Sequence, residues 1–493
     1  MKKLIRTIYL LIIAYILLVL FISYDKTYLN FREFPIIPNI ISGLIAGLII
    51  FLLLKLNTKI DDKKYKKILI ILSIVVLILQ IIILKYTYFY TDWDVKAIRD
   101  AVLNNNVKGN YYLTKYPNTL LYLSFIKFYY SIPLIGKYYF PLLVFNALLV
   151  NISGIIASLI IKKYTNNLYA IIGYIIMTFL VILSPWINIP YSDTLVILIP
   201  ITIIYLYTKD NKKTKDYLLI GFLSILGYYI KPTALIVLIG IIILSIINLL
   251  TKKNKINLKI ISTVLIGMIF SFLLCKTAIK LTGFTPSKTT EPFTMIHYLK
   301  MGQNNESYGQ YNKDDVEESD TKGKRNDIEK TINRIKERKI LGQFKFIKIK
   351  TLLNYNDGTF AWGREGDVFY YKILAKDSKI SSLFKNYFYK DYKYNYIFKI
   401  ITQLLWILVL LLTMFAGIKD KKDKNSILYL SIIGITLFLT IFECRARYLY
   451  CYSPIFITLS MIGLNNLKQL KKGRLKWLIH MILMEQSMME IHL

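Results

Sequence analysis

Residues 68–84 read ILIILSIVVLILQIIIL, and the polar segment Thr91-Asp92-Trp93-Asp94 follows them closely. An uncharged run of about this length is what an α-helix needs to cross the apolar core of a bilayer. Similar runs recur along the whole chain, which has 493 residues, is 55% hydrophobic and has a mean hydropathy of +0.46. The sequence therefore predicts an all-α polytopic membrane protein, because a helix satisfies its own backbone hydrogen bonds in lipid.

Twelve apolar segments predict about 12 transmembrane helices. The first segment is interpreted as a retained span and not as a signal peptide, because no small-residue cleavage site follows it. A further segment at 117–132 is short and carries Lys127 among several tyrosines, so we expect an interfacial helix there. The predicted spans are Ile5–Ser23, Ile37–Lys55, Ile68–Leu84, Tyr138–Ile161, Leu168–Leu183, Thr194–Tyr207, Tyr217–Ile230, Ala234–Leu250, Ile260–Leu281, Ile397–Ile418, Ile427–Phe442 and Tyr448–Leu464.

The net charge of +34 is concentrated in short loops between these segments. Basic loops of this kind mark the cytoplasmic side of a membrane protein. We therefore expect a plasma-membrane protein with both termini in the cytoplasm, basic loops that contact membrane lipids, and no nucleic-acid partner. Three cysteines without zinc-site spacing predict neither a zinc site nor a disulfide framework. The basic loops are Lys55–Lys67, Lys162-Lys163, Lys209–Lys215, Lys252–Lys259, Lys419–Lys424 and Lys468–Lys476.

This topology divides the chain into four parts and places one large loop outside the cell. The parts are an N-terminal transmembrane region (1–281), an extracytoplasmic loop (282–396), C-terminal transmembrane helices (397–466) and a basic cytoplasmic tail (467–493). A loop of that length is expected to be ordered and functional. The spacing of its apolar residues predicts an amphipathic helix along the membrane surface, and the alternative is a solvated cap. These apolar residues are Ile328, Ile332, Ile335, Phe344 and Ile347.

Asp92 and Asp94 stand at the predicted outer end of the third span. Paired carboxylates at a lipid boundary carry a desolvation cost that a proton-transfer role or a bound cation would explain. On an extended segment both carboxylates would point to one side. One could then deprotonate a substrate hydroxyl, while the other positions the first carboxylate or binds a divalent metal. The structural alternative is that one of them caps the helix expected to begin near Val95.

A second acidic segment, Tyr191-Ser192-Asp193, lies on the same predicted face. Pro185 and Pro190 interrupt the helical pattern just before it, and the next predicted span begins at Thr194. Asp193 therefore stands at a favourable capping position, which is the structural interpretation. The functional interpretation is substrate binding beside the first acidic pair.

Cations occur at two other predicted outer turns, against the positive-inside trend. Lys231, in Tyr229-Ile230-Lys231-Pro232-Thr233, is suited to bind a phosphate at headgroup depth, and snorkelling is the alternative. The segment Glu443-Cys444-Arg445-Ala446-Arg447-Tyr448 offers two guanidinium forks that match phosphate oxygens. Its structural alternative is an internal pair between Glu443 and Arg447.

Two motifs stand out in the long loop. One is Met301-Gly302-Gln303-Asn304, and the other is a glycine-rich turn at 356–366 that carries Trp362 and Arg364. Aromatic and charged groups on such a turn are suited to stack on a sugar ring and bind its hydroxyls, which makes Trp362 and Arg364 candidate substrate-binding residues. Asn304, from the first motif, is a further candidate. The alternative is packing of the loop onto the spans. His297 has no His or Cys partner nearby in the sequence and is a weak metal candidate.

Taken together, these motifs resemble the GT-C superfamily of integral-membrane glycosyltransferases, which includes protein O-mannosyltransferases and aminoarabinose transferases. The resemblance extends to about Leu464 and rests on Asp92 and Asp94, Tyr116-Pro117-Asn118, Tyr191-Ser192-Asp193 and the late outer loop. A narrower resemblance, to family 39-like members from low-GC Gram-positive bacteria, rests on four segments: Lys231-Pro232-Thr233, Met301–Asn304, 356–360 and Glu443–Tyr448.

The resemblance implies a GT-C-like fold and a polyprenyl-phosphate-linked sugar as donor. It also implies inverting transfer on the outer membrane face, to a cell-envelope glycan, glycolipid or protein. Asp94 or Asp92 would activate the acceptor hydroxyl, while Lys231, Arg445 and Arg447 would hold the departing phosphate. No cofactor is expected to be required, and the superfamily varies in its use of a divalent metal.

Two other classes of membrane protein remain as alternatives. A lipid-linked saccharide flippase or transporter would carry charges in the middle of its spans, together with related halves. A polysaccharide polymerase or ligase would also present a large outer loop with arginines. The paired acids in the first outer loop and the scarcity of mid-span charges favour the glycosyltransferase.

Overall fold

The computed structural model describes residues 1–23, 34–252, 258–418 and 424–471. Its first part contains α1 (Lys2–Ile22), α2 (Ile36–Lys55), α3 (Asp62–Thr87), β1 (Phe89–Thr91), α4 (Trp93–Leu103), α5 (Tyr111–Lys115), α6 (Leu120–Ser131), α7 (Phe140–Tyr164), α8 (Asn167–Met177), α9 (Ser192–Leu195), α10 (Leu198–Thr208), α11 (Thr214–Ile230), α12 (Leu235–Lys252) and α13 (Leu258–Leu281). Then follow α14 (Met295–Gly302), α15 (Lys313–Glu337), α16 (Lys339–Tyr355), α17 (Trp362–Glu365), β2 (Tyr370–Ile373), α18 (Lys379–Phe388), α19 (Asn395–Ile418), α20 (Ser426–Ile441) and a last helix at 453–471. Short 3-10 or π turns join them: η2 (Pro117–Thr119), η3 (Thr178–Ile182), η4 (Pro185–Asn188), η5 (Pro232–Ala234), η6 (Gly366–Phe369) and η7 (Ala446–Tyr452).

Each predicted apolar segment lies on one or more of these helices. Among the described residues, seven helices are long and apolar enough to cross a membrane. Three shorter apolar helices lie at Asn167–Ile182, Ser192–Thr208 and Ser426–Ile441, and the two other predicted segments correspond to α11 and to the helix at 453–471. The seven are Lys2–Ile22, Ile36–Lys55, Asp62–Thr87, Phe140–Tyr164, Pro232–Thr251, Leu258–Leu281 and Asn395–Ile418.

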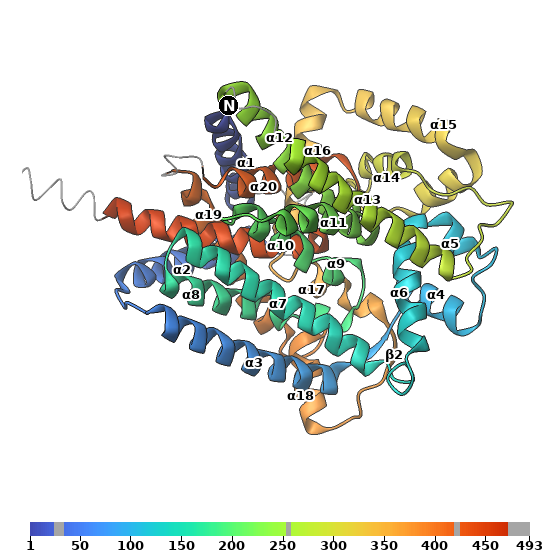
Figure 1. Ribbon diagram of the computed structural model, residues 1–493, viewed down its shortest axis with the longest axis horizontal. Helices are drawn as coiled ribbons and strands as arrows, with labels where there is room; N and C mark the ends of the chain where they lie inside the picture. Colours follow the sequence, from blue (N-terminus) through green and yellow to red (C-terminus); the bar gives the residue numbers. More distant parts are fainter. Residues whose placement is uncertain (24–33, 253–257, 419–423, 472–493) are drawn as a thin grey trace, which may run out of the picture.

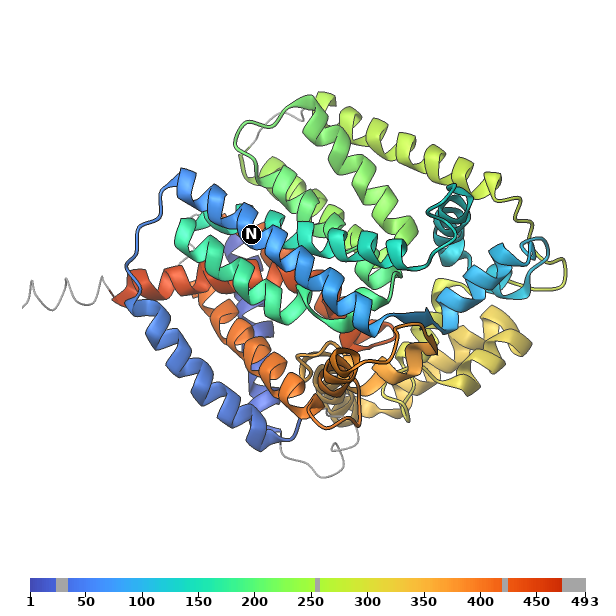
Figure 2. The same ribbon diagram turned by 90° about the horizontal axis from the view of Figure 1, so that it is seen from below.

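The shorter polar helices gather at one end of this bundle. Figures 1 and 2 both place α4, α5, α14 and α15 at the end of the molecule opposite the described end of the helix at 453–471. The helix α6, where an interfacial helix is predicted, lies at the same end and has only 12 residues, too few to cross a bilayer. The long helices α3 and α7 run side by side toward it (Figure 1). This end carries the segment with Asp92 and Asp94, at the start of α4 (Figure 1).

A small sheet, which the periodicity of the sequence does not predict, joins the first acidic segment to the long loop. Strand β1 pairs with β2 in antiparallel register, with Phe89 opposite Ile373 and Thr91 opposite Tyr370. Just beyond it, the backbone N–H of Asp92 donates to the carbonyl of Phe369 at 2.9 Å. The loop at 282–396 is thereby attached directly to the segment that carries Asp92 and Asp94.

A crossing of α11 and α13 depends on two glycines. A Cβ atom on Gly221 would lie 2.0 Å from the carbonyl oxygen of Val264, and one on Gly267 would lie 2.1 Å from that of Leu218. Helices in lipid associate largely through such close backbone approach, because there is no hydrophobic effect to drive them together. The two glycines therefore set the distance between these helices.

The predicted amphipathic helix of the long loop is two helices rather than one. The first, α15, is kinked at Gly323 (φ +70°), and a left-handed Lys339 (φ +49°) separates it from α16. Ile347, on α16, is half-buried. Segments 253–257, 419–423 and 472–476 of the predicted basic loops lie outside the described residues, as does the predicted cytoplasmic tail from 472 onward.

Candidate active site

An ion pair between Asp193 and Lys231 forms the centre of the site. Asp193 lies in the first turn of α9 and Lys231 directly follows α11. Both residues are buried, and the Nζ atom of Lys231 contacts the Oδ1 atom of Asp193. The N-cap of α9 is Tyr191, so Asp193 does not act as the helix cap, and Lys231 does not snorkel into solvent. A buried charge is retained when it is paired in this way.

Arg447, from η7, approaches the other oxygen of the same carboxylate. Its Nε atom lies 3.8 Å from Asp193 Oδ2 and, among the described residues, this buried nitrogen finds no hydrogen-bond partner. Burial disfavours the charged form, but attraction to Tyr448 and then to Asp193 raises the pKa of Arg447. The Lys231 ammonium also lies 4.1 Å from the ring centroid of Tyr448. A buried guanidinium with an unused N–H is a ready anion ligand.

The second arginine belongs to a separate ion-pair group. Arg445 lies 3.2 Å from Glu365 on α17 and 3.3 Å from Glu443. Glu443 is therefore within ion-pair distance of Arg445, and not of Arg447 as in the structural alternative considered for this segment. Arg364, next to Glu365, is half-buried on α17. The glycine-rich turn of the long loop thus reaches the segment 443–448.

Asp94 faces a group of tyrosines that connects it to these cations. Burial, followed by the charge of Asp94, raises the pKa of Tyr191, and Arg447 also lies close enough to influence that phenol. Burial raises the pKa of Tyr112 as well, with contributions from Tyr191 and Asp94. Tyr191 is therefore within electrostatic reach of both the carboxylate of Asp94 and the guanidinium of Arg447.

Further tyrosines bring Glu443 into the same neighbourhood. The pKa of Tyr298 on α14 is raised by burial and then by the charges of Glu443, Tyr116 and Asp94. No sequence motif singles out Tyr112, Tyr298 or Glu365 as a site residue. With 40 tyrosines in the chain, residue type alone could not single out the ones beside Asp94.

Asp92 and Asp94 do not share one side of an extended segment, which corrects that expectation. Asp92 occupies the N-cap position of α4, but its side chain makes no capping hydrogen bond. Trp93 follows with φ +54° and begins α4, so the segment is not extended between the two acids; its side chain is 55% exposed. A bulky residue in the left-handed region is strained, and such strain is concentrated at functional sites. Asp94 lies among the site tyrosines, whereas Asp92 influences Lys96.

Two predicted substrate-binding residues have structural roles instead. Trp362 is buried, donates its indole N–H to the carbonyl of Phe388 at 2.7 Å and packs edge-on against Trp186, so its ring is not available to stack on a sugar. Asn304 donates to Asp315 at 2.8 Å, and its oxygen accepts from the backbone of Glu306 and Ser307. Its hydrogen-bonding groups therefore hold a turn in the loop.

The described residues contain no group of three or more His, Cys, Asp or Glu side chains arranged to hold a metal ion. Asp92 and Asp94 therefore have no third protein ligand of these types in the described part of the chain. His297 is buried and its Nδ1 atom lies 2.8 Å from the hydroxyl of Ser319. It contributes to the packing between α14 and α15.

A family model described as "conserved hypothetical integral membrane protein" matches residues 1–468. The chain belongs to this family. Membership in an integral membrane family, together with the long apolar helices, identifies a multi-pass membrane protein. Every residue of the candidate site lies within the matched region. Searches of curated proteins and of solved structures each found no match.

Proposed function

We propose that this protein is a GT-C-type glycosyltransferase of the plasma membrane. It moves a sugar from a polyprenyl-phosphate donor to a hydroxyl group of a cell-envelope glycan, glycolipid or protein on the outer face. The observation that carries the proposal is the position of Tyr191, which is influenced by both the Asp94 carboxylate and the Arg447 guanidinium. A general base and an anion ligand in one neighbourhood are what transfer from a phosphate leaving group requires.

The proposed reaction is a single displacement at the anomeric carbon of the sugar. The acceptor hydroxyl oxygen forms a bond to that carbon while the bond from carbon to the phosphate oxygen breaks. The hydroxyl proton passes to the carboxylate of Asp94, and the electron pair of the broken bond leaves with the polyprenyl phosphate. The configuration at the anomeric carbon is inverted, because attack and departure occur on opposite faces.

Among the cations, Arg447 is the best placed to hold the leaving phosphate. Lys231 is engaged by Asp193, and Arg445 is engaged by Glu365 and Glu443. The Nε atom of Arg447 is buried without a hydrogen-bond partner among the described residues. Lys231 and Arg445 supply charge to the same region, while the paired carboxylates hold their side chains in place.

The proposed arrangement in the membrane has about twelve spans, with both termini in the cytoplasm. The shorter apolar helices, α11 and the helix at 453–471 would complete the seven long helices. Paired or bent helices can cross a bilayer where the protein locally covers their ends. The end that carries α4, α5 and α15 then faces the outside.

The test is an assay of the purified full-length protein in lipid vesicles with a panel of polyprenyl-phosphate sugars. We expect wild type to release polyprenyl phosphate and to transfer sugar, with Asp94→Asn inactive and Asp92→Asn largely active. Asp100→Asn is the matched control, because this α4 acid pairs with Lys96 at 2.9 Å instead of facing the tyrosines. The proposal is wrong if wild type consumes no donor, if it moves the intact donor across the bilayer, or if Asp94→Asn keeps full activity.

A further inference from the structure

The corner between α15 and α16 exposes several large apolar side chains. Ile340, Leu341 and Phe344, in the first turns of α16, are 76%, 84% and 67% exposed. Ile332 and Ile335 extend the exposed face onto the last turns of α15. We call these five residues the apolar corner. Several large apolar side chains that are exposed at one place mark a contact surface, whereas single exposed apolar residues do not.

The position of α16 places this corner at the level of the outer end of a membrane helix. The Nζ atom of Lys350 donates to the carbonyl of Phe442 at 2.7 Å, and Phe442 is the residue directly after α20. Farther along α16, the Tyr355 hydroxyl lies 2.7 Å from Thr436 inside α20. The helix also packs against α1, where Tyr15 faces Thr351. α16 therefore enters the bundle from its outer edge, and its first turns remain at that edge.

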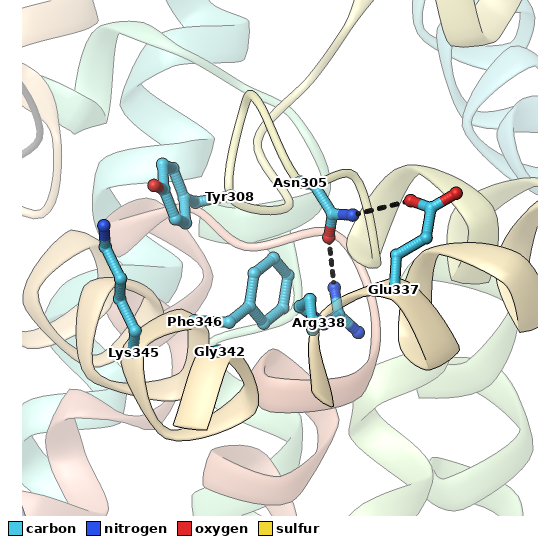
Figure 3. Close-up of a pocket in the computed structure, with 7 residues that line it drawn as sticks. All are labelled: Asn305, Tyr308, Glu337, Arg338, Gly342, Lys345 and Phe346. Atoms are coloured by element: carbon cyan, nitrogen blue, oxygen red, sulfur yellow. Dashed lines mark hydrogen bonds between the residues drawn. The ribbon is translucent and has the colours of Figure 1, made fainter. Parts of the chain in front are cut away.

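Basic side chains lie beside the apolar corner. A shallow cavity of about 240 Å³ lies next to it, with Arg338, Lys345 and Phe346 among its lining residues (Figure 3). Arg338 is held by Asn305 at 2.8 Å and lies 3.9 Å from the ring centroid of Phe346. Lys345 is exposed, and Figure 3 shows its ammonium group on the opposite side of Phe346 from Arg338. Apolar residues flanked by cations are typical of a helix that binds an anionic bilayer surface.

We propose that the apolar corner is a membrane anchor that enters the outer leaflet, with Lys345 bound to the phosphate of an anionic phospholipid. Continuity with the exposed apolar faces of α1 favours the bilayer as the occupant, because the exposed Leu11 and Leu18 lie on a candidate span that packs against α16. The anchor is independent of the proposed transferase activity. The anchor would hold the long loop at a constant depth relative to the bilayer. It would also hold the segment at Phe442, which Lys350 contacts, at that depth.

The test uses nitroxide labels on the full-length protein in vesicles of phosphatidylcholine with phosphatidylglycerol. Labels are placed at Leu341→Cys and Phe344→Cys, with Glu317→Cys on the exposed first half of α15 as the aqueous control. The native cysteines, Cys275, Cys444 and Cys451, are buried, so the reagent reacts with the introduced thiol. Collision with oxygen, which concentrates in lipid, is compared with collision with a water-soluble nickel chelate.

We expect the oxygen-to-chelate ratio at 341 and 344 to be several-fold higher than at 317. A ratio equal to that at 317 would show that the corner lies in water. Low access to both reagents would show that protein covers it, and either result overturns the proposal.

The role of the headgroup is tested separately with the label at 344. Lys345→Glu, or vesicles of phosphatidylcholine alone, should lower the ratio, whereas Lys313→Glu at the exposed start of α15 should leave it unchanged. An equal ratio in all of these samples would overturn the assignment of an anionic phospholipid.

Discussion

The carboxylate of Asp193 binds Lys231 through one oxygen and lies 3.8 Å from the Nε atom of Arg447 through the other. One buried acid therefore compensates two cations that come from separate parts of the chain. Because none of the three is well solvated, the position of each depends on the other two. This relationship makes Asp193 an organiser of the cation group and not a capping residue.

Asp193→Asn should destabilise the protein. Removal of the acid leaves the buried Lys231 and the half-buried Arg447 without this compensating charge. Loss of one partner of a buried charged group typically costs about 3–5 kcal/mol. The change is measured as a fall in the midpoint of thermal unfolding in detergent. Asp210→Asn is the control, because the Asp210 side chain is 88% exposed in its pair with Lys163 and its loss should have no measurable effect. Equal midpoints for the two variants would contradict the buried network.

Arg447→Lys should impair use of the polyprenyl-phosphate donor more than it impairs folding. A lysine keeps the charge near Asp193 but loses the planar fork and the unused Nε–H. We expect kcat/KM for the donor to fall on the order of 10²-fold, the scale seen when one stabilising donor is lost. Arg325→Lys, on the exposed surface of α15, should leave kcat/KM unchanged. A donor kcat/KM close to wild type in Arg447→Lys would argue against phosphate binding by this residue.

Gly221→Leu should disrupt the crossing of α11 and α13. The first side-chain carbon alone would lie 2.0 Å from the carbonyl oxygen of Val264, which belongs to the backbone and cannot rotate away. Overpacking of this kind costs about 1–3 kcal/mol or more. Size-exclusion chromatography after heating should show loss of the monodisperse protein at a lower temperature. Gly47→Leu is the matched control, since nothing lies within 4 Å of a Cβ at that position of α2. The close approach of the helices would be refuted if both variants survived heating equally well.

His297 should make the loop at 282–396 sensitive to acid. Burial lowers the pKa of His297 from 6.5 to about 4, so between these values the unfolded chain binds a proton that the folded chain does not. The contribution of the neutral His297 to the free energy of unfolding is therefore fully present above pH 6.5. It falls by about 3 kcal/mol as the pH drops from 6.5 to 4. The measurement is the midpoint of urea unfolding across that range.

His297→Gln is the comparison for this pH dependence. Glutamine can keep the contact with Ser319 but does not titrate, so the variant should lose less stability between pH 6.5 and pH 4 than wild type. Parallel curves for the two proteins would assign the pH dependence to other groups.

Much of the helical framework could be predicted from hydrophobic runs alone. The run at 68–84 lies within α3, and the predicted spans at 5–23 and 37–55 correspond closely to α1 and α2. Charge patterning likewise pointed to Asp94, Lys231 and Arg447 as unusual residues at helix ends. These features are local, because a segment enters lipid according to its own composition and a charge at its end is visible in the sequence.

Contacts between distant segments were decided only by the tertiary structure. The left-handed Trp93 separates Asp94 from Asp92, and Asp94 lies near Tyr191. Trp362 packs against Trp186, so its ring is not free to bind a sugar, although the sequence suggested that it could. Hydropathy and charge spacing carry no information about such partners. Local composition was therefore enough to identify the segments that are apolar enough for a membrane and the polar residues that end them. Which of those polar residues meet depends on the folded chain, because the free energy of a buried charge or ring depends on neighbours that lie far away along the chain.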